Sequence, residues 1–561
     1  MTAIAAPFQR IVADAGRRDG LALTYHRLML VMLVFTGVTI LIAGRLMFLQ
    51  LFTDRSAGAQ VIDPLIPTRA DIVDRNGVPL ARTIDSWTIS IHPNRLLGNP
   101  VELAARLAAL MPQHRAADYL RVMRSGKSYA FLARRAMPEL VQAVNALGEP
   151  AIEFSREPER LYPQTALAAH ILGWTDMDGR GVTGMERVMN GRLTDPGLRG
   201  TPVALSIDSR VQAAMESELA AAIAKYNAIG GTGIVLDVHT GELLALASLP
   251  TFNPNAVGKS DPSAMFNRAT MGDYELGSTF KPITVAAAIE AGVITSMAQR
   301  YDASAPLAIG RFHIKDDEPQ NRSLDIPETL VYSSNIVAAR IADQMGPQRM
   351  SQAFRNLGFD KPVPIELDQK VRPLWPRNWG RTETMTSGFG HGLAVTPLHL
   401  AMAYAALVNG GIWRPATLLR TDHPVAGRRV FSEATSYKIR QLLRLVVMLG
   451  TGKKAEVPGY RVGGKTGTAE KSIIGGYSKK MNVSTFAAAF PIDEPRYVVV
   501  AMLDAPHGTA DTFGFTTAGF VSAPIVSGVI SRIGPMVGVY PDSHKDIDVS
   551  QLLPLIANSR H

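Results

Sequence analysis

The hydrophobic and polar positions of the chain follow different periods in different segments. Two pairs of short apolar runs, each interrupted by turn residues, predict β-hairpins over Gly233 to Ser248 and over Ser484 to Leu503. Between these pairs lie apolar stretches of helical length, such as Leu398 to Val408. Strands at both ends of a region with helices in the middle predict an antiparallel sheet packed against helices, an α/β or α+β architecture.

The region before the first of these hairpins has a weaker pattern and contains no recognisable chemistry. Asn76-Gly77 predicts a two-residue hairpin turn, and helical periodicity occurs near residues 101–110 and 140–147. The composition changes near Gly200. The predicted boundaries are a first folded domain at 53–200, a larger domain at 201–545 and a C-terminal tail at 546–561.

A long apolar segment lies near the N-terminus. Residues Leu28 to Gly44 are uncharged and mostly apolar, and the run resumes after Arg45 as far as Phe52. Crossing about 30 Å of hydrocarbon takes about 20 helical residues, so residues 28–52 are predicted to span a membrane, with Arg45 reaching toward the interface. The run is too long for a signal peptide and no Ala-x-Ala site follows it, which predicts an uncleaved, single-pass signal anchor.

The charges around this segment predict its orientation. Arg10, Arg17, Arg18 and Arg27 precede it, whereas Arg45 and Arg55 are the arginines near its far end. The positive-inside rule therefore places residues 1–27 in the cytoplasm as a short tail and exports the rest of the chain.

Composition excludes several classes of function. Cysteine is absent from the 561 residues, which rules out disulfides, zinc-thiolate sites and thiol nucleophiles. The net charge of +9 does not predict nucleic-acid binding, because the basic residues are interspersed with 49 acidic ones and no long basic run occurs. No zinc-protease, calcium-loop or dinucleotide-binding pattern is present, so neither a metal nor a cofactor is expected.

Three short motifs each occur once. Ser278-Thr279-Phe280-Lys281 is the only Ser-x-x-Lys, and Ser333-Ser334-Asn335 is the only Ser-x-Asn. Lys465-Thr466-Gly467 is the only Lys-Thr-Gly, and Thr468 follows it. Any one of these patterns arises by chance in a chain of this length, but three single occurrences in this order indicate one site.

The first motif predicts a serine nucleophile with a lysine base. A helix is expected from Ser278 to Ala291, which places Lys281 on the same face as Ser278. The amine can take the hydroxyl proton only if burial or a second cation, for which Lys465 is the candidate, lowers its pKa. The backbone N–H of a serine at a helix N-terminus is also free to stabilise an oxyanion.

The other two motifs predict proton transfer and substrate binding. The Ser333 hydroxyl can relay a proton, and the Asn335 amide can hold peptide groups, although for this pair alone an ordinary helix N-cap is the simpler account. Lys465 contributes a cation, and Thr466, Gly467 and Thr468 are predicted to bind a substrate carboxylate.

A nucleotide-binding loop is the formal alternative from another class of enzyme. Gly459 to Thr466 satisfies the pattern G-x-x-x-x-G-K-[ST]. Such a loop needs an apolar strand before it and a helix after it. Here Lys453 to Pro458 precede the loop, and Gly467 and the Gly475-Gly476 pair interrupt the segment after it.

Together the motifs resemble those of class B penicillin-binding proteins, which are monofunctional D,D-transpeptidases of peptidoglycan. The resemblance extends from about Arg69 to Asp504. Residues His170 to Asp178 run directly into Gly181 to Glu186 without a long insert, which resembles the division-specific, septal (FtsI) branch. Further matching segments are Arg69 to Ala81, Arg160 to Pro163, Tyr274 to Lys281 and Arg461 to Lys471.

The resemblance implies an architecture, a reaction and a set of partners. It implies an N-terminal pedestal, or dimerisation, domain before a transpeptidase domain in the periplasm, anchored in the bacterial inner membrane. Ser278 would attack a D-Ala-D-Ala stem peptide, release the terminal D-Ala and pass the acyl group to a neighbouring amine, and β-lactams would inhibit it. The implied partners are a SEDS-family glycan polymerase of the FtsW type and other divisome membrane proteins.

Two departures and several alternatives remain at this point. The family usually has glycine where Ala70 stands and proline where Leu276 stands. An elongation-type transpeptidase, a D,D-carboxypeptidase with water as acceptor, or a penicillin-binding sensor without turnover would carry the same motifs. A β-lactamase would need a water-activating carboxylate after the Ser-x-Asn motif, and the sequence offers no convincing candidate.

Overall fold

The computed structural model describes residues 27–45, 47, 68–310, 312–473 and 476–557. The chain divides into two units, Met1–Ile66 and Pro67–His561. The described part of the first unit is a 19-residue helix, Arg27–Arg45, with a mean hydropathy of 2.1, which is long and apolar enough to cross a membrane. Apart from Met47, the predicted continuation to Phe52 lies outside the described residues, as do residues 1–26 of the predicted tail.

The second unit is built around a five-stranded antiparallel sheet with the strand order β14-β15-β16-β6-β7. The first and last parts of the predicted larger domain thus meet in one sheet, with Val235 of β6 opposite Val499 of β16. Both predicted hairpins and the predicted fold class are confirmed. The strands are β6 (Gly230–Asp237), β7 (Leu243–Leu249), β14 (Gly463–Ile473), β15 (Gly476–Phe490) and β16 (Tyr497–Asp504).

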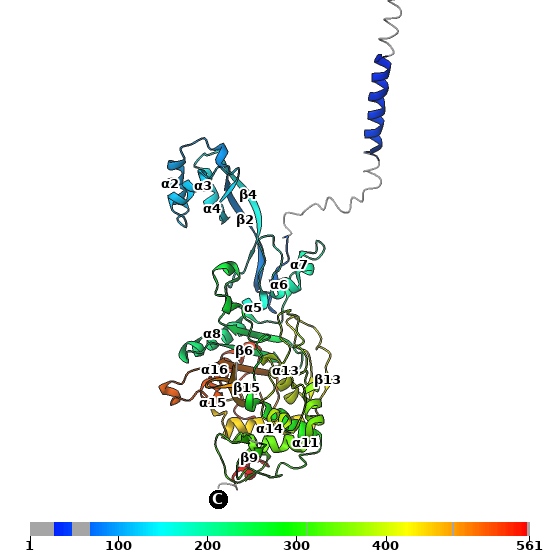
Figure 1. Cartoon of the computed structure of the whole chain (residues 1–561), viewed down its shortest axis with the longest axis vertical. Helices are drawn as coiled ribbons and strands as arrows, with labels where there is room; N and C mark the ends of the chain where they lie inside the picture. The colour runs from blue at the N-terminus through cyan, green and yellow to red at the C-terminus, as the bar shows by residue number, and fades with distance from the viewer. Residues whose placement is uncertain (1–26, 46, 48–67, 311, 474–475, 558–561) are drawn as a thin grey trace, which may run out of the picture. The chain divides into compact units, whose positions relative to one another are not determined.

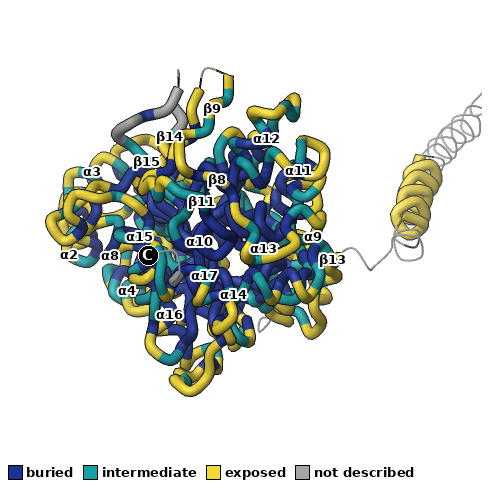
Figure 2. Tube along the Cα trace, turned by 90° about the horizontal axis from the view of Figure 1, so that it is seen from below, coloured by how far each residue is buried: buried dark blue, intermediate teal, exposed yellow. Residues whose placement is uncertain are grey.

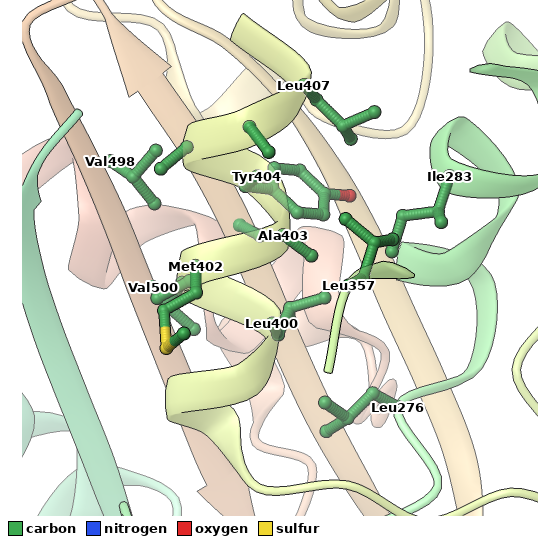
Figure 3. Packing of buried hydrophobic residues seen from close by; sticks show 14 of the residues in the cluster. Leu276, Ile283, Leu357, Leu400, Met402, Ala403, Tyr404, Leu407, Val498 and Val500 are labelled. Atoms are coloured by element: carbon green, nitrogen blue, oxygen red, sulfur yellow. The ribbon is translucent and has the colours of Figure 1, made fainter. Parts of the chain in front are cut away.

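Helices cover both faces of this sheet because its central strands are apolar on both sides. Successive side chains of a strand point to opposite faces, and β16 is buried along its whole length. Val498 and Val500 pack on the face covered by α13 (Pro397–Val408) and α14 (Glu433–Leu449), and Figure 3 shows Val500 beside Met402 of α13. Val499 and Leu503 face α8 (Ser209–Lys225) and α16 (Ala523–Ile533).

The predicted helix over Leu398 to Val408 is α13, and it joins the sheet to the helices that carry the motifs. All twelve of its residues are buried. Tyr404 has no exposed surface, and its hydroxyl donates to Thr279 O at 2.9 Å. The hydroxyl of Tyr404 points away from Val498 in Figure 3. A buried phenol needs such an acceptor, so this bond connects the core to the turn that holds Ser278.

The region between the central strands contains mainly helices and short strands. Figure 2 shows α10 among the buried elements, and all six of its residues are buried. The helices are α9 (Lys281–Glu290), α10 (Ile326–Val331), α11 (Asn335–Asn356), α12 (Arg381–Ser387), α15 (Ala518–Val521) and α17 (Leu553–Ala557). The short strands are β8 (Tyr301–Asp302), β9 (Leu307–Ile309), β10 (Phe312–Ile314), β11 (Ser323–Leu324), β12 (Ile412–Trp413) and β13 (Arg428–Arg429).

The preceding residues form a second sheet with a small core of their own. Its first strands form the predicted hairpin, with Ile72 opposite Ala81 and Gly77 in the turn at φ +85°. The strands are β1 (Ile72–Val73), β2 (Pro79–Ile91), β3 (Ala130–Ala136), β4 (Ile152–Leu161) and β5 (Val203–Ala204). The helices are α2 (Pro100–Leu110), α3 (Ala116–Met123), α4 (Pro138–Asn145), α5 (Ala169–Leu172), α6 (Gly184–Val188) and α7 (Asn190–Thr194).

A buried ion cluster links three of the segments on which the family resemblance rests. Glu186 has no exposed surface and accepts bonds from Arg69 Nε at 2.6 Å and from Arg160 Nε at 2.7 Å. Removing one partner of such a cluster leaves an uncompensated buried charge. These motif residues therefore join three segments that are distant in the sequence, while the predicted domain boundaries stay predictions.

Candidate active site

Ser278 lies in a single 3₁₀ turn, η5 (Gly277–Phe280), and not in the α-helix that the sequence predicted. The α-helix α9 begins only at Lys281, with Pro282 in its first turn, where a missing N–H costs no hydrogen bond. Residues three apart in a 3₁₀ turn are eclipsed. Ser278 and Lys281 therefore still share one face, and α9 ends before Gly292 as expected.

Two buried lysines meet at one hydroxyl. Lys281 and Lys465 have no exposed surface. Lys281 Nζ donates to the backbone oxygen of Ser333 and to its Oγ at 3.1 Å, and Lys465 Nζ donates to the same Oγ at 2.9 Å. Within the described chain, the side-chain amine of Lys281 donates to Ser333 and not to Ser278, whose backbone oxygen accepts from the Lys281 N–H. Ser333 thus connects the first motif to the third.

Burial changes the acid–base chemistry of both lysines. It lowers the pKa of Lys281 to about 7, an effect that Asp316 and Asp317 oppose. Burial lowers the pKa of Lys465 well below 10.5, and the charge of Lys281 lowers it further. The low pKa of Lys281 comes from removal of the amine from water, so this lysine can be a neutral base near neutral pH.

The sequence allowed an ordinary helix N-cap at the second motif. In the structure that N-cap is Ser334. Its Oγ accepts from Val337 N at 3.1 Å at the start of α11 and donates to Asp316 at 2.7 Å. Ser333 adopts a left-handed conformation, with φ +58°. Because Ser334 caps the helix, the hydroxyl of Ser333 is left to the two lysines.

Sequence reasoning missed two carboxylates at this site. Asp316 is 8% exposed and accepts from Ser334 Oγ and from Ile336 N, so it holds the second motif in place. Asp317 lies near enough to Lys281 and Lys465 to raise the pKa of each. The acidic run Asp316-Asp317-Glu318 was visible in the sequence, but no fixed spacing connects it to the lysines.

The third motif lies on the edge strand of the sheet. Thr466 and Thr468 alternate with Gly467 on β14 and so point to the same face. Thr466 Oγ1 pairs with Thr451 Oγ1 at 2.7 Å, and Thr468 Oγ1 accepts from Ala518 N at 3.1 Å. The nucleotide-loop alternative is wrong, because Lys465 and Thr466 lie inside a strand and not at a strand-to-helix turn.

Three glycines allow the chain to pack closely around the nucleophile. A Cβ on Gly467 would overlap the carbonyl oxygen of Leu276, and one on Gly277 would lie 2.7 Å from Thr468 O. Gly390, at φ +82°, accepts from Gly277 N at 3.2 Å, and a Cβ there would overlap Gly277 O. The backbone of the loop that contains Gly390 therefore lies directly against the backbone of Gly277.

The two departures from the family pattern are both buried. Ala70 has no exposed surface, and Leu276, which is 1% exposed, packs in the core just before η5. Leu276 has φ −100°, away from the value near −65° that proline imposes. The chain therefore enters the turn of Ser278 in a backbone conformation that leucine allows and proline disfavours.

A methyl group at Gly390 should disturb the site more than one at an open glycine. We expect Gly390→Ala to slow acylation by a β-lactam at least about tenfold, because displacement of Gly277 misplaces Ser278. Gly292→Ala is the matched control, since Gly292 also has positive φ, +69°, but no atom lies within 4 Å of its Cβ position. Both substitutions cost about 1–3 kcal/mol of backbone strain. Equal acylation rates in the two variants would contradict this prediction.

Two cavities meet at the nucleophile. One of about 320 Å³ and one of about 710 Å³ are both lined by Ser278, Asp317, Thr468 and Thr517. Along the shared face of β14, Thr466 lines the smaller cavity and Glu470 the larger one. The site therefore offers two compartments along one strand edge, both within or near the usual size of ligand pockets.

The second motif is divided between these cavities. Ser333 lines the smaller one, whereas Asn335 lines the larger one together with Phe389 and His391. Asn335 Nδ2 donates to Lys315 O at 2.9 Å, which fixes its amide at the cavity wall. The structure thus brings the predicted residues of all three motifs together, apart from Gly467, which serves close packing.

Family comparisons agree with this geometry. The penicillin-binding protein transpeptidase domain matches residues 231–530, and the penicillin-binding protein dimerisation domain matches residues 64–191. The probable peptidoglycan D,D-transpeptidase FtsI of Caulobacter vibrioides is 39% identical over 95% of this chain and 91% of its own length. The peptidoglycan D,D-transpeptidase FtsI of Escherichia coli is 30% identical over 85% of each chain.

A solved structure gives the same result. Penicillin-binding protein 3 of Mycobacterium tuberculosis, crystallised with aztreonam, is 25% identical and superimposes with a TM-score of 0.67 over 85% of this chain and 97% of its own. The chain therefore belongs to the class B penicillin-binding proteins, as an FtsI-type peptidoglycan D,D-transpeptidase.

Proposed function

We propose that this transpeptidase forms its acyl-enzyme on Ser278 and that Lys281, Ser333 and Lys465 move the protons. The observation that carries the proposal is the Ser333 hydroxyl, which two buried lysines contact where two cavities meet at Ser278. The aztreonam complex of the related penicillin-binding protein supports a β-lactam-sensitive serine in this fold.

Acylation follows from the positions of these groups. Neutral Lys281 accepts the proton of Ser278, and the oxygen attacks the carbonyl carbon of the penultimate D-alanine. The N–H of Ser278, in the first turn of η5, donates to the oxyanion. When the C–N bond breaks, the proton that Lys281 accepted passes through the Ser333 hydroxyl to the leaving nitrogen. The products are an ester on Ser278 and free D-alanine.

The two cavities divide the substrate between them. We assign the donor stem peptide to the larger cavity, where Asn335 and the edge of β14 offer peptide hydrogen bonds. The leaving D-alanine belongs in the smaller cavity, because the proton that it needs comes from Ser333. Thr466 and Thr468 offer hydroxyls to its carboxylate. An acceptor amine then enters from the side of the smaller cavity and attacks the ester on Ser278, in the reverse of the step that released D-alanine.

The rate of acylation should depend on pH through Lys281. The base is the neutral amine, whose fraction grows as pH rises through its pKa of about 7. We therefore expect the acylation rate constant to rise about tenfold per pH unit below that value and to level off above it. Stopped-flow acylation with a reporter β-lactam measures this profile. A rate that falls over the same interval would contradict the role of Lys281 as base.

We further propose that the enzyme works at the division septum, anchored by the helix Arg27–Arg45 with its catalytic domain in the periplasm. The identity to FtsI proteins over nearly the whole chain supports the septal role, and Arg10, Arg17 and Arg18 before the helix support the orientation. A SEDS-family glycan polymerase of the FtsW type and other divisome membrane proteins are the proposed partners.

Depletion of the protein tests this role. Cells that carry only Ser278→Ala should grow as filaments without septa while side-wall growth continues, and the wild-type chain should restore division. Rounded, widening cells would point to the elongation branch instead. In spheroplasts, a protease added outside should degrade the catalytic domain, and protection of that domain would contradict the orientation.

A further inference from the structure

Most of the chain's net positive charge lies in one lobe, far in sequence from the motifs. Residues 92–137 contain eight arginine and lysine residues and two carboxylates, a net charge of +6, whereas the whole chain carries +9. They include η2 (Pro93–Arg95), α2, α3 and β3, and Figure 1 shows α2 and α3 at one end of β2 and β4. We call residues 92–137 the basic lobe. A surface with so much charge of one sign attracts anionic partners.

Three exposed basic side chains of the basic lobe lie in segments that contact one another. His92, the residue before η2, donates from Nδ1 to Ser128 O at 2.8 Å. This bond joins η2, which ends at Arg95, to the loop after α3, which contains Arg124 and Lys127. All three basic side chains are exposed to solvent. Their charge therefore faces outward.

The carboxylate of α3 does not neutralise these charges. Asp118 pairs with Arg115 at 3.6 Å and with Arg121 at 3.2 Å. Within the part of the chain that the structure describes, Arg95, Arg124 and Lys127 have no ion-pair partner. Their charge is thus available to an external anion.

Exposed aromatic rings border the three charges. Tyr129 and Phe131 are 39% and 47% exposed. The ring of Tyr129 lies 5.4 Å from that of His92 and 5.2 Å from that of Phe131, and the guanidinium of Arg134 lies 4.4 Å from the Phe131 centroid. Aromatic rings beside arginine and lysine are typical of surfaces that meet lipid, where the rings enter the interface and the cations bind headgroups.

A bilayer lies within reach of the basic lobe. The apolar helix ends at Arg45, and Thr68 is the first described residue of the second unit, so 22 residues separate the two. A segment of this length spans at most about 80 Å. Tethering raises the local concentration of the lobe near the membrane, so a weak attraction suffices to hold it there.

We propose that the basic lobe is a second membrane contact, which binds the anionic phospholipid headgroups of the bilayer that anchors the chain. Arg95, Arg124 and Lys127 attract the headgroup phosphates, and Tyr129 and Phe131 enter the interface. The proposal uses the proposed anchoring and goes beyond acyl transfer. Two points of attachment restrict the orientation of the exported chain at the membrane, which one point does not.

The absence of cysteine makes the test specific, because one introduced cysteine is a unique labelling site. Full-length Ser128→Cys is labelled with a fluorophore and reconstituted in nanodiscs of phosphatidylcholine, with or without phosphatidylglycerol. Both kinds of disc contain a lipid whose headgroup carries a quencher. We expect quenching in the discs with phosphatidylglycerol, and we expect it to disappear at 1 M salt, where the Debye length falls to about 3 Å.

Removal of two charges should weaken this contact. In the same labelled protein, Arg124→Gln, Lys127→Gln should lower the ratio of bound to free lobe about fivefold for each charge removed. Arg377→Gln, Lys545→Gln is the matched control, because it removes two exposed charges outside the basic lobe and should be quenched like the unsubstituted chain. Labelling of Ser278 by a β-lactam shows that each variant is folded.

The possible outcomes separate the proposal from its alternatives. Equal quenching with and without phosphatidylglycerol, or none in either, would overturn it. Binding of polyglutamate to the basic lobe, without lipid-dependent quenching, would instead assign this surface to an acidic protein. A chain that does not enter nanodiscs would contradict the proposed anchor, whereas an incorporated chain without lipid-dependent quenching would contradict the lipid contact alone.

Discussion

Replacement of Ser278 by alanine is expected to abolish covalent labelling by a β-lactam and transfer of the stem peptide. Ser278 is the serine at the junction of both cavities, and its oxygen forms the bond that holds the acyl group. Removing the nucleophile of a serine acyl-enzyme typically lowers turnover on the order of 10⁶-fold. Intact-mass spectrometry after incubation with a reporter β-lactam measures the adduct directly.

A serine on the opposite face of the sheet gives the control. Ser531 lies exposed in α16, so Ser531→Ala should label like the wild-type chain. The side chain of Ser278 has no hydrogen-bond partner within the described chain, so its removal should leave the melting temperature unchanged. A persistent adduct in Ser278→Ala would show that another residue is the nucleophile.

The substitution Lys465→Met should have the second largest effect on the rate of acylation, after the loss of Ser278. The substitution removes one of the two lysine side chains that contact Ser333 Oγ, together with the donor to Thr466 Oγ1. The loss of a charge-assisted contact beside the reacting centre costs about 2–4 kcal/mol, which corresponds to acylation slower by about 30- to 1000-fold. Methionine keeps the apolar stem of the buried side chain, so the protein should remain folded.

The acylation rate constant of Lys465→Met should be compared with that of Lys545→Met, an exposed lysine near the C-terminus. If Lys465→Met is acylated at the wild-type rate, Lys465 has no role in the mechanism. Magnesium-dependent ATP binding that this substitution abolishes would contradict the assignment of the strand to acyl transfer.

The sequence predicted the elements whose pattern is local. Asn76-Gly77 sets its own turn, and the apolar runs of β6, β7, β15 and β16 need no distant partner to be recognised as strands. The catalytic residues were found because each motif is a fixed spacing of chemically distinct side chains. Both kinds of signal lie within a few consecutive residues.

The features that the sequence did not reveal depend on packing between distant segments. The backbone of Ser333 turns left-handed where Asp316, 18 residues before Ser334, binds the start of α11. Similarly, the α-helix begins at Lys281 and not at Ser278, and the preceding turn packs against Gly390, which is 113 residues away from Gly277 in the chain. The low pKa of Lys281 follows from burial, which a motif does not encode.

The strand order of the main sheet also determines when this enzyme can come into being during its own synthesis. β6 and β7 leave the ribosome early, but the strand that joins them to β15 is β16, which ends at Asp504. Until then the strand that carries Lys465 cannot join the rest of the sheet, and β6 has an unpaired edge prone to association with other chains. A growing chain therefore has no complete acyl-transfer site until residue 504 has been made. A chain truncated before that residue is expected to be inactive and prone to aggregate.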